Sequence, residues 1–111
     1  MKNNILVIGL GYVGLPLALS LSKFYNVFGF DKSLKRIDEL KRGEDYNKEV
    51  SKNEILKSKI KFFDKEKELN HKIDVFIITV PTPVNAKKKP DIRNLISACK
   101  FVSKIINKNN L

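Results

Sequence analysis

The stretch Ile5-Leu6-Val7-Ile8-Gly9-Leu10-Gly11-Tyr12-Val13-Gly14 decides the fold of this 111-residue chain. It opens with a four-residue apolar run that ends at a glycine, a length and an ending that favour a buried strand. Beyond the glycines, apolar residues recur at helical spacing from Val13 to Phe24, and Pro16 falls in the first turn, where its missing N–H costs little. The sequence therefore predicts a strand, a G-x-G-x-x-G turn and a helix in direct succession.

The middle of the chain continues this alternation. Val27–Phe30 is predicted as a second strand and Ser33–Arg42 as a helix that Gly43 closes. The segment Ser51-Lys52-Asn53-Glu54 has the form of a capping box and predicts a short helix after it. Ile60–Phe63 is a weaker strand candidate.

One more strand and one more helix are predicted in the last third of the chain. Asp74–Val80 is a nearly continuous apolar run, typical of a parallel strand covered on both faces. Asp91 is predicted as the N-cap of a helix with an apolar stripe, which places the single cysteine, Cys99, in the core. The stripe consists of Ile92, Leu95, Ile96, Cys99, Val102, Ile105 and Ile106.

Strands that alternate with helices predict an α/β fold, here a Rossmann-type, doubly wound parallel sheet in three α/β/α layers. The chain stops after the helix that follows the fourth strand, so Asp74–Val80 is expected to expose an edge that a further strand covers. We therefore expect residues 1–111 to form one domain of a longer protein.

Composition narrows the functional classes. The net charge of +10 is compatible with a nucleic-acid surface, but the lysines are spread along the chain, and the one run, Lys87-Lys88-Lys89, has no interleaved aromatic residues. We favour a lysine-rich surface over a nucleic-acid binder. No apolar run reaches the roughly 18 residues of a membrane span, and one cysteine allows no intrachain disulfide, which fits the cytoplasm.

The glycine-rich turn has the spacing of a dinucleotide site. Gly9 permits a tight turn, Gly11 lets a pyrophosphate approach the backbone, and Gly14 lets the helix pack on the sheet. The free N–H groups of the first helical turn, including those of Tyr12 and Val13, are candidate phosphate donors. The hexapeptide alone is a weak signal, and its strand–turn–helix context strengthens it.

An acidic residue ends the second strand. Asp31 comes 22 residues after Gly9, where a carboxylate accepts hydrogen bonds from the adenine ribose and repels a 2′-phosphate, which favours NAD over NADP. Lys32 and Arg36 lie close in sequence, and Arg36 is a candidate to flank the adenosine. The alternative is a surface aspartate beside a solvated arginine.

The segment Thr79-Val80-Pro81-Thr82-Pro83-Val84 is predicted at the carboxyl edge of the sheet, where ligands of such folds bind. Two prolines stiffen it, and Thr82 could offer its hydroxyl and N–H to the nicotinamide half of the cofactor. A rigid turn with no ligand contact is equally compatible with the sequence.

Several of these motifs resemble, in order, the UDP-glucose/GDP-mannose dehydrogenase family. They are GLGYVGLPLA, Asp31 with Arg36, Glu49-Val50-Ser51, and VPTPVN with Pro90-Asp91. The form VPTPV with Glu49-Val50-Ser51 looks most like the branch that oxidises UDP-N-acetylhexosamines, such as the UDP-N-acetylglucosamine and UDP-N-acetylgalactosamine 6-dehydrogenases. That branch shows aspartate where this chain has Asn85.

The resemblance implies an N-terminal NAD-binding domain of a cytoplasmic oxidoreductase for surface polysaccharide biosynthesis, which oxidises a sugar C6 alcohol to the carboxylate. It implies a pyrophosphate site at Gly9, Gly11, Tyr12, Val13 and Gly14, adenosine contacts at Asp31 and Arg36, and Thr82 near the nicotinamide ribose. The family's catalytic residues, central helix and UDP-sugar-binding domain would lie beyond residue 111, as would its dimer contacts. No catalytic or metal-ligating residue is therefore expected here, and a homodimer or larger assembly is expected of the full protein.

A non-catalytic NAD-sensing module shares the turn and Asp31, and remains the alternative. The Thr-Pro segment favours the dehydrogenase. A catalytic cysteine further along the reading frame would decide between the two.

Overall fold

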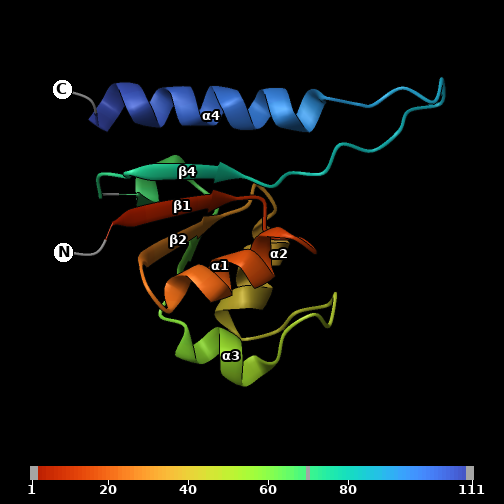
Figure 1. Cartoon of the computed structure of the whole chain (residues 1–111). Coiled ribbons are helices and arrows are strands. Elements are labelled where there is room, and N and C mark those ends of the chain that lie inside the picture. The colour runs from red at the N-terminus through yellow and green to blue at the C-terminus, as the bar shows by residue number, and fades with distance from the viewer. Residues whose placement is uncertain (1–2, 70, 110–111) are drawn as a thin grey trace.

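The computed structural model describes residues 3–69 and 71–109, and its strands form one parallel sheet in the order β3-β2-β1-β4 (Figure 1). The strands are β1 Asn4–Ile8, β2 Asn26–Phe30, β3 Lys61–Phe63 and β4 Val75–Ile78. The helices are α1 Gly14–Ser22, α2 Leu34–Lys41, α3 Lys52–Lys57 and α4 Arg93–Asn109, with a 3-10 turn at Glu66–Glu68. The predicted parallel α/β sheet is confirmed, including the weaker strand candidate.

Side-chain alternation along β1 builds a core on each face of the sheet. Ile5 and Val7 pack into a cluster that includes residues of α1, α2 and α3, whereas Leu6 and Ile8 pack into a second cluster that includes residues of α4. Figure 1 shows α4 alone on one side of the sheet and the other three helices on the opposite side. This arrangement confirms the three α/β/α layers.

Serine caps and a glycine set the ends of α2 and α3. The Ser33 hydroxyl accepts a hydrogen bond from the backbone N–H of Arg36 and starts α2, and Gly43 follows α2 with a φ of +79°. Ser51 and Glu54 form the predicted capping box at the start of α3. These ends are set by residues that are close in sequence, which is why the sequence predicted them.

The strand β4 is less buried than expected. It lies at the edge of the sheet, as predicted, but every one of its residues is at least partly exposed, and Val75 is 40% exposed. The expectation that this strand is covered on both faces holds in part, because Ile77 packs against the cluster of α1, α2 and α3 and the neighbouring Phe76 and Ile78 pack against the cluster of α4. An edge strand has one neighbour, so its outer side meets solvent.

The expected burial along α4 needs a correction. The helix packs through Ala98 and Ile105, with Phe101 and Val102 partly buried beside them, while Cys99 is exposed. Four more members of the predicted stripe are also exposed, namely Ile92, Leu95, Ile96 and Ile106. The apolar stripe is wider than the surface the sheet offers, so only its near side is buried.

The start of α4 also differs slightly from the prediction. The helix begins at Arg93, and the carbonyl of Ile92 accepts the N–H of Ile96 at 2.9 Å. Asp91 lies one residue before that cap and accepts the N–H of Arg93 at 3.0 Å. Hydrogen bonds from the Arg93 side chain and backbone lower the pKa of Asp91 to about 2. Asp91 therefore holds the first turn from outside the helix.

Candidate functional site

A cavity of about 580 Å³ lies at the carboxyl ends of β1, β2 and β4. Its walls come from the glycine-rich turn, the start of α2, the loop between α2 and α3, the residues after β4 and the first half of α4. Ligands of open parallel sheets bind at this edge, where the strand order changes direction. Gly9, Gly11, Asp31 and Arg36, all predicted from the sequence, line this cavity.

The three glycines of the turn differ in their backbone geometry and in the space around them. Gly9 has a φ of +97°, which favours glycine, and its N–H donates to the carbonyl of Phe30 at 2.8 Å. A Cβ added at Gly11 would meet no protein atom within 4 Å. A Cβ added at Gly14 would instead overlap the carbonyl oxygen of Gly9. Gly14 therefore allows close packing, and Gly11 leaves open space over the backbone.

Backbone donors at the start of α1 are available to a ligand. Among the described residues, no hydrogen bond uses the N–H of Gly11, Tyr12, Val13 or Gly14. The α1 N-terminus follows directly, so the helix dipole adds partial positive charge there. Tyr12 and Val13 are residues with exposed fractions of 67% and 65%, and neither lines the cavity. Their contribution to a ligand would come from the backbone.

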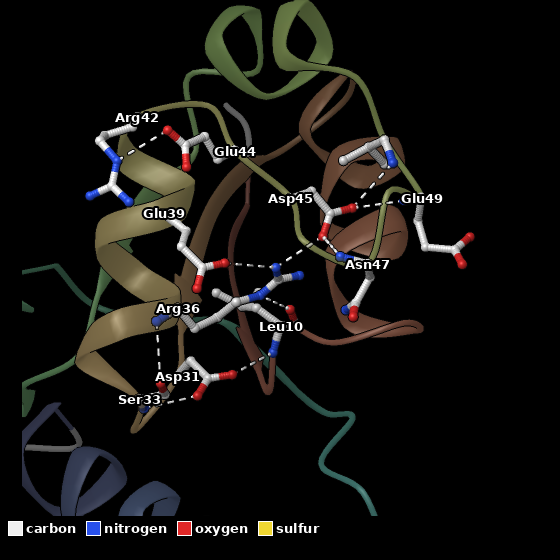
Figure 2. Close-up of polar contacts among 11 residues, drawn as sticks. Leu10, Asp31, Ser33, Arg36, Glu39, Arg42, Glu44, Asp45, Asn47 and Glu49 are labelled. Carbon is white, nitrogen blue, oxygen red and sulfur yellow. Dashed lines mark hydrogen bonds and ion pairs between the residues drawn. The ribbon is translucent and has the colours of Figure 1, made fainter.

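Asp31 holds the turn in place from the end of β2 (Figure 2). Its Oδ2 accepts the N–H of Leu10 at 3.0 Å and its Oδ1 accepts the N–H of Ser33 at 2.9 Å. Each carboxylate oxygen can accept a further hydrogen bond, so both remain able to bind a hydroxyl. The structure thus gives Asp31 a structural role that the sequence did not predict.

The Arg36 side chain extends from α2 to the backbone carbonyl of Leu10 (Figure 2). Its Nε donates to the Leu10 carbonyl at 2.7 Å, and its Nη1 lies 2.9 Å from Oδ1 of Asp45 and 3.7 Å from Oε2 of Glu39. The Nη2 atom is buried and has no partner among the described residues. A buried donor without an acceptor costs free energy, so Nη2 is the unsatisfied group of this arginine.

Asp45 is a site residue that sequence analysis missed. Its side chain is 0% exposed, and its two oxygens accept the backbone N–H groups of Asn47, Glu49 and Val50 in addition to the Arg36 guanidinium. Burial by itself would raise the pKa of Asp45, but these hydrogen bonds outweigh it and lower the pKa below the usual value. Asp45 is therefore ionised at neutral pH and fixes the loop that carries Tyr46 and Asn47 into the cavity wall.

Thr79 is a second residue that the sequence analysis left without a role. Its Oγ1 donates to the carbonyl of Gly9 at 2.7 Å, with the Ile8 carbonyl oxygen 3.2 Å away. The sequence shows a threonine at the end of an apolar strand, but it does not show that the hydroxyl of this residue bonds to the Gly9 carbonyl. By contrast, Thr82 is exposed and does not line the cavity, so its proximity to the nicotinamide ribose stays a prediction.

The described residues hold no group of three or more His, Cys, Asp and Glu side chains that could bind a metal ion. None of the helices within that part of the chain is both long and apolar enough to cross a bilayer.

His71 is exposed and contacts Phe28 with a ring-centroid distance of 5.1 Å, as expected for a surface histidine.

Comparisons with known proteins agree with this geometry. The model of the UDP-glucose/GDP-mannose dehydrogenase family, NAD binding domain, matches residues 3–111. The UDP-N-acetyl-D-glucosamine 6-dehydrogenase of Salmonella typhi is 44% identical over 97% of this chain and 25% of its own length. Protein CapL of Staphylococcus aureus is 42% identical over 96% of this chain and 25% of its own length. The chain thus spans about a quarter of the length of these curated relatives.

Solved structures give the same assignment. A UDP-D-ManNAc dehydrogenase from Pyrococcus horikoshii is 32% identical and superposes with a TM-score of 0.81, over 92% of this chain and 25% of that one. A UDP-glucose dehydrogenase from Pyrobaculum islandicum, at 22% identity and a TM-score of 0.87, covers 98% of this chain and 27% of its own and supports the fold. The chain belongs to the UDP-glucose/GDP-mannose dehydrogenase family and corresponds to its NAD-binding domain, so its cofactor is NAD.

Proposed function

We propose that this chain supplies the NAD half of the active site of a nucleotide-sugar 6-dehydrogenase. The observation that carries the proposal is the turn at Gly11, where open space lies over unused backbone N–H groups and Asp31 stands at the tip of the next strand. The space that a Cβ at Gly11 would enter lies in the same cavity wall as Asp31 and Arg36, an arrangement that fits a dinucleotide.

The proposed residue roles follow from these contacts. The backbone of Gly9, Gly11, Tyr12, Val13 and Gly14 binds the pyrophosphate. Asp31 accepts hydrogen bonds from the adenosine ribose, and Arg36 flanks the adenosine. Thr82, from the exposed segment after β4, is proposed to lie near the nicotinamide ribose. When bound, NAD accepts a hydride, whereas this chain's residues bind and orient it.

The substrate proposal rests on the relatives. The names of the Salmonella typhi and Pseudomonas aeruginosa relatives are both UDP-N-acetyl-D-glucosamine 6-dehydrogenase, at 44% and 39% identity. We propose that the full protein oxidises the C6 alcohol of a UDP-N-acetylhexosamine to the carboxylate for surface polysaccharide biosynthesis. The catalytic residues and the UDP-sugar-binding domain are proposed to lie beyond residue 111, in a protein that works as a homodimer or larger assembly.

Location and other partners complete the proposal. We propose a cytoplasmic protein, because a single cysteine fits a reducing compartment. We propose no nucleic-acid or membrane partner, because the lysines are dispersed along the chain rather than gathered with aromatic residues.

Calorimetric titration of the 111-residue chain with NAD tests the cofactor site. Saturable binding that Gly11→Val abolishes supports it, whereas binding that is unchanged in Gly11→Val overturns the pyrophosphate assignment.

The substrate is tested by NADH production from UDP-N-acetylglucosamine with the protein encoded by the complete reading frame. The 111-residue chain alone is expected to give no turnover. A complete reading frame without a catalytic cysteine would favour the NAD-sensing module instead.

A further inference from the structure

Arg36, Glu39 and Asp45 form a charged cluster beside the cavity, and the balance of their charges bears on the choice between NAD and NADP. Arg36 lines the cavity, and an arginine just beyond the acidic strand end is the residue that accommodates a 2′-phosphate in NADP-binding relatives of this fold. Taken alone, Arg36 would therefore weaken the discrimination that Asp31 provides. Its surroundings determine whether that positive charge acts on the ligand.

Two carboxylates surround the guanidinium (Figure 2). Asp45 lies 2.9 Å from Nη1 and Glu39 lies 3.7 Å from the same atom. The exposed fractions of the side chains are 12% for Arg36, 5% for Glu39 and 0% for Asp45. Because solvent screens such buried charges little, the two carboxylates offset the positive charge of the guanidinium that lines the cavity.

The hydrogen bonds of Asp45 keep this carboxylate charged near neutral pH. Three backbone N–H groups of its own loop hold the carboxylate in place and lower its pKa, so it stays charged near neutral pH. Lys32 is the other cation of the cavity wall, and its Nζ donates to Oδ1 of Asn94 at 3.0 Å. Carboxylates therefore offset the charge of Arg36, whereas the partner of Lys32 is a neutral amide that leaves the charge of the lysine in place.

We propose that Asp45 is a specificity-determining residue, which excludes NADP by neutralising Arg36 at the adenosine end of the cavity. Asp31 repels the 2′-phosphate directly, and Asp45 removes the positive charge that would otherwise offset this repulsion. Asp45 acts through Arg36 and is not itself a ligand of the cofactor. This inference rests on the proposed NAD site.

The test compares the dissociation constants of NAD and NADP for the 111-residue chain and its variants at one fixed salt concentration. Asp45→Asn removes the charge at nearly constant volume, and the ratio of the NADP to the NAD dissociation constant is expected to fall about tenfold. Asp38→Asn is the matched control, because Asp38 lies on α2 with an exposed side chain outside the cavity wall. It makes the same change in net charge and should leave the ratio unchanged.

The double variant Asp45→Asn/Arg36→Gln identifies the route of the effect. The fall in the ratio should disappear, because no uncovered guanidinium remains to attract the 2′-phosphate. Persistence of the fall in the double variant would overturn the role of Arg36. A ratio that stays constant in Asp45→Asn, including equal weakening of both cofactors by a loosened loop, would overturn the proposal.

Glu39→Gln keeps the test decisive if Asp45→Asn does not fold. It removes the second neutralising charge, 3.7 Å from Nη1, and should lower the ratio by a smaller factor. An unchanged ratio in a folded Glu39→Gln then overturns the proposal. If the wild-type chain binds neither cofactor, the proposed function itself fails, and this result is distinct from NAD binding with a fixed ratio.

Discussion

Thr79 Oγ1 donates a 2.7 Å hydrogen bond to the carbonyl oxygen of Gly9, across 70 residues of sequence. The bond ties the residue after β4 to the first glycine of the turn. A Cβ at Gly14 would also come within 2.5 Å of the same hydroxyl, so Thr79, Gly9 and Gly14 pack as one unit. The shape of the turn therefore depends on β4 as well as on its own glycines.

Replacement of Thr79 tests this unit. Thr79→Val leaves the part-buried Gly9 carbonyl without its donor and should lower the free energy of unfolding by about 1–2 kcal/mol, whereas Thr79→Ser should retain most of it. Urea denaturation measures both. Thr82→Val, at an exposed position, is the control and should change stability by less than about 0.5 kcal/mol. Equal stability of Thr79→Val and wild type would contradict the role of the bond.

Alanine at two glycines of the turn should give opposite results. Gly11→Ala adds a Cβ that meets no protein atom within 4 Å, so the fold should persist while NAD binding weakens. Gly14→Ala places its Cβ against the Gly9 carbonyl and should destabilise the fold by about 1–3 kcal/mol. Thermal unfolding and NAD titration of both variants provide the comparison. A destabilised Gly11→Ala or a fully stable Gly14→Ala would show that the turn packs differently.

Asp31 should contribute to both binding and stability. Asp31→Ala removes the acceptor for the N–H groups of Leu10 and Ser33, so we expect a stability loss of about 1–2 kcal/mol with a NAD affinity at least about tenfold weaker. Asp38→Ala, exposed on α2, should change neither quantity. Calorimetry and denaturation on the same samples separate the two effects. Full NAD affinity in Asp31→Ala would refute its assignment to the ribose.

Acid should destabilise the chain partly through Asp45. Because the folded pKa of Asp45 lies below the ordinary value of about 3.9, its contribution to stability is complete above that value. The contribution is lost as the pH falls through the folded pKa, where protonation breaks the contacts with Arg36 and the loop. The urea midpoint measured from neutral pH to about pH 3 should fall less steeply in Asp45→Asn. Parallel pH profiles would exclude Asp45 as a source of the acid sensitivity.

The exposure of Cys99 gives a direct test of how α4 packs. A thiol reagent such as a disulfide dye should modify the native chain quantitatively without denaturant, because Cys99 lies on the outer side of α4. The rate should be close to that of the chain in denaturant. Protection in the native state that denaturant removes would mean that α4 is rotated, with the stripe of Ile96 and Cys99 facing inward.

Local chemistry explains why the sequence predicted most of the fold. Neighbours within a few residues set the helix starts at Ser33 and Ser51 and the helix end at Gly43. The alternation along β1, with Ile5 and Val7 on one face and Leu6 and Ile8 on the other, is equally local. The same holds for the G-x-G-x-x-G turn, since each glycine meets a requirement of the backbone at its own position.

The burial of α4 was less predictable because helical periodicity identifies an apolar stripe but not which side of it meets the sheet. Ala98 and Ile105 are buried, whereas Ile96 and Cys99 at neighbouring positions are exposed. That choice depends on the width of the sheet and on the position of β4 at its edge. Neither quantity is encoded in the helix itself.

The sequence by itself determined the parallel α/β sheet, the glycine-rich turn and the acid at the end of β2, because these follow from backbone requirements and short-range contacts. Only the tertiary structure decided that Asp45 meets Arg36 and that Thr79 meets Gly9. The physical reason is that a buried charge or hydroxyl is satisfied by whichever group folding brings within about 3 Å, and partners 9 and 70 residues apart are joined by loops and strands whose path no short sequence motif specifies.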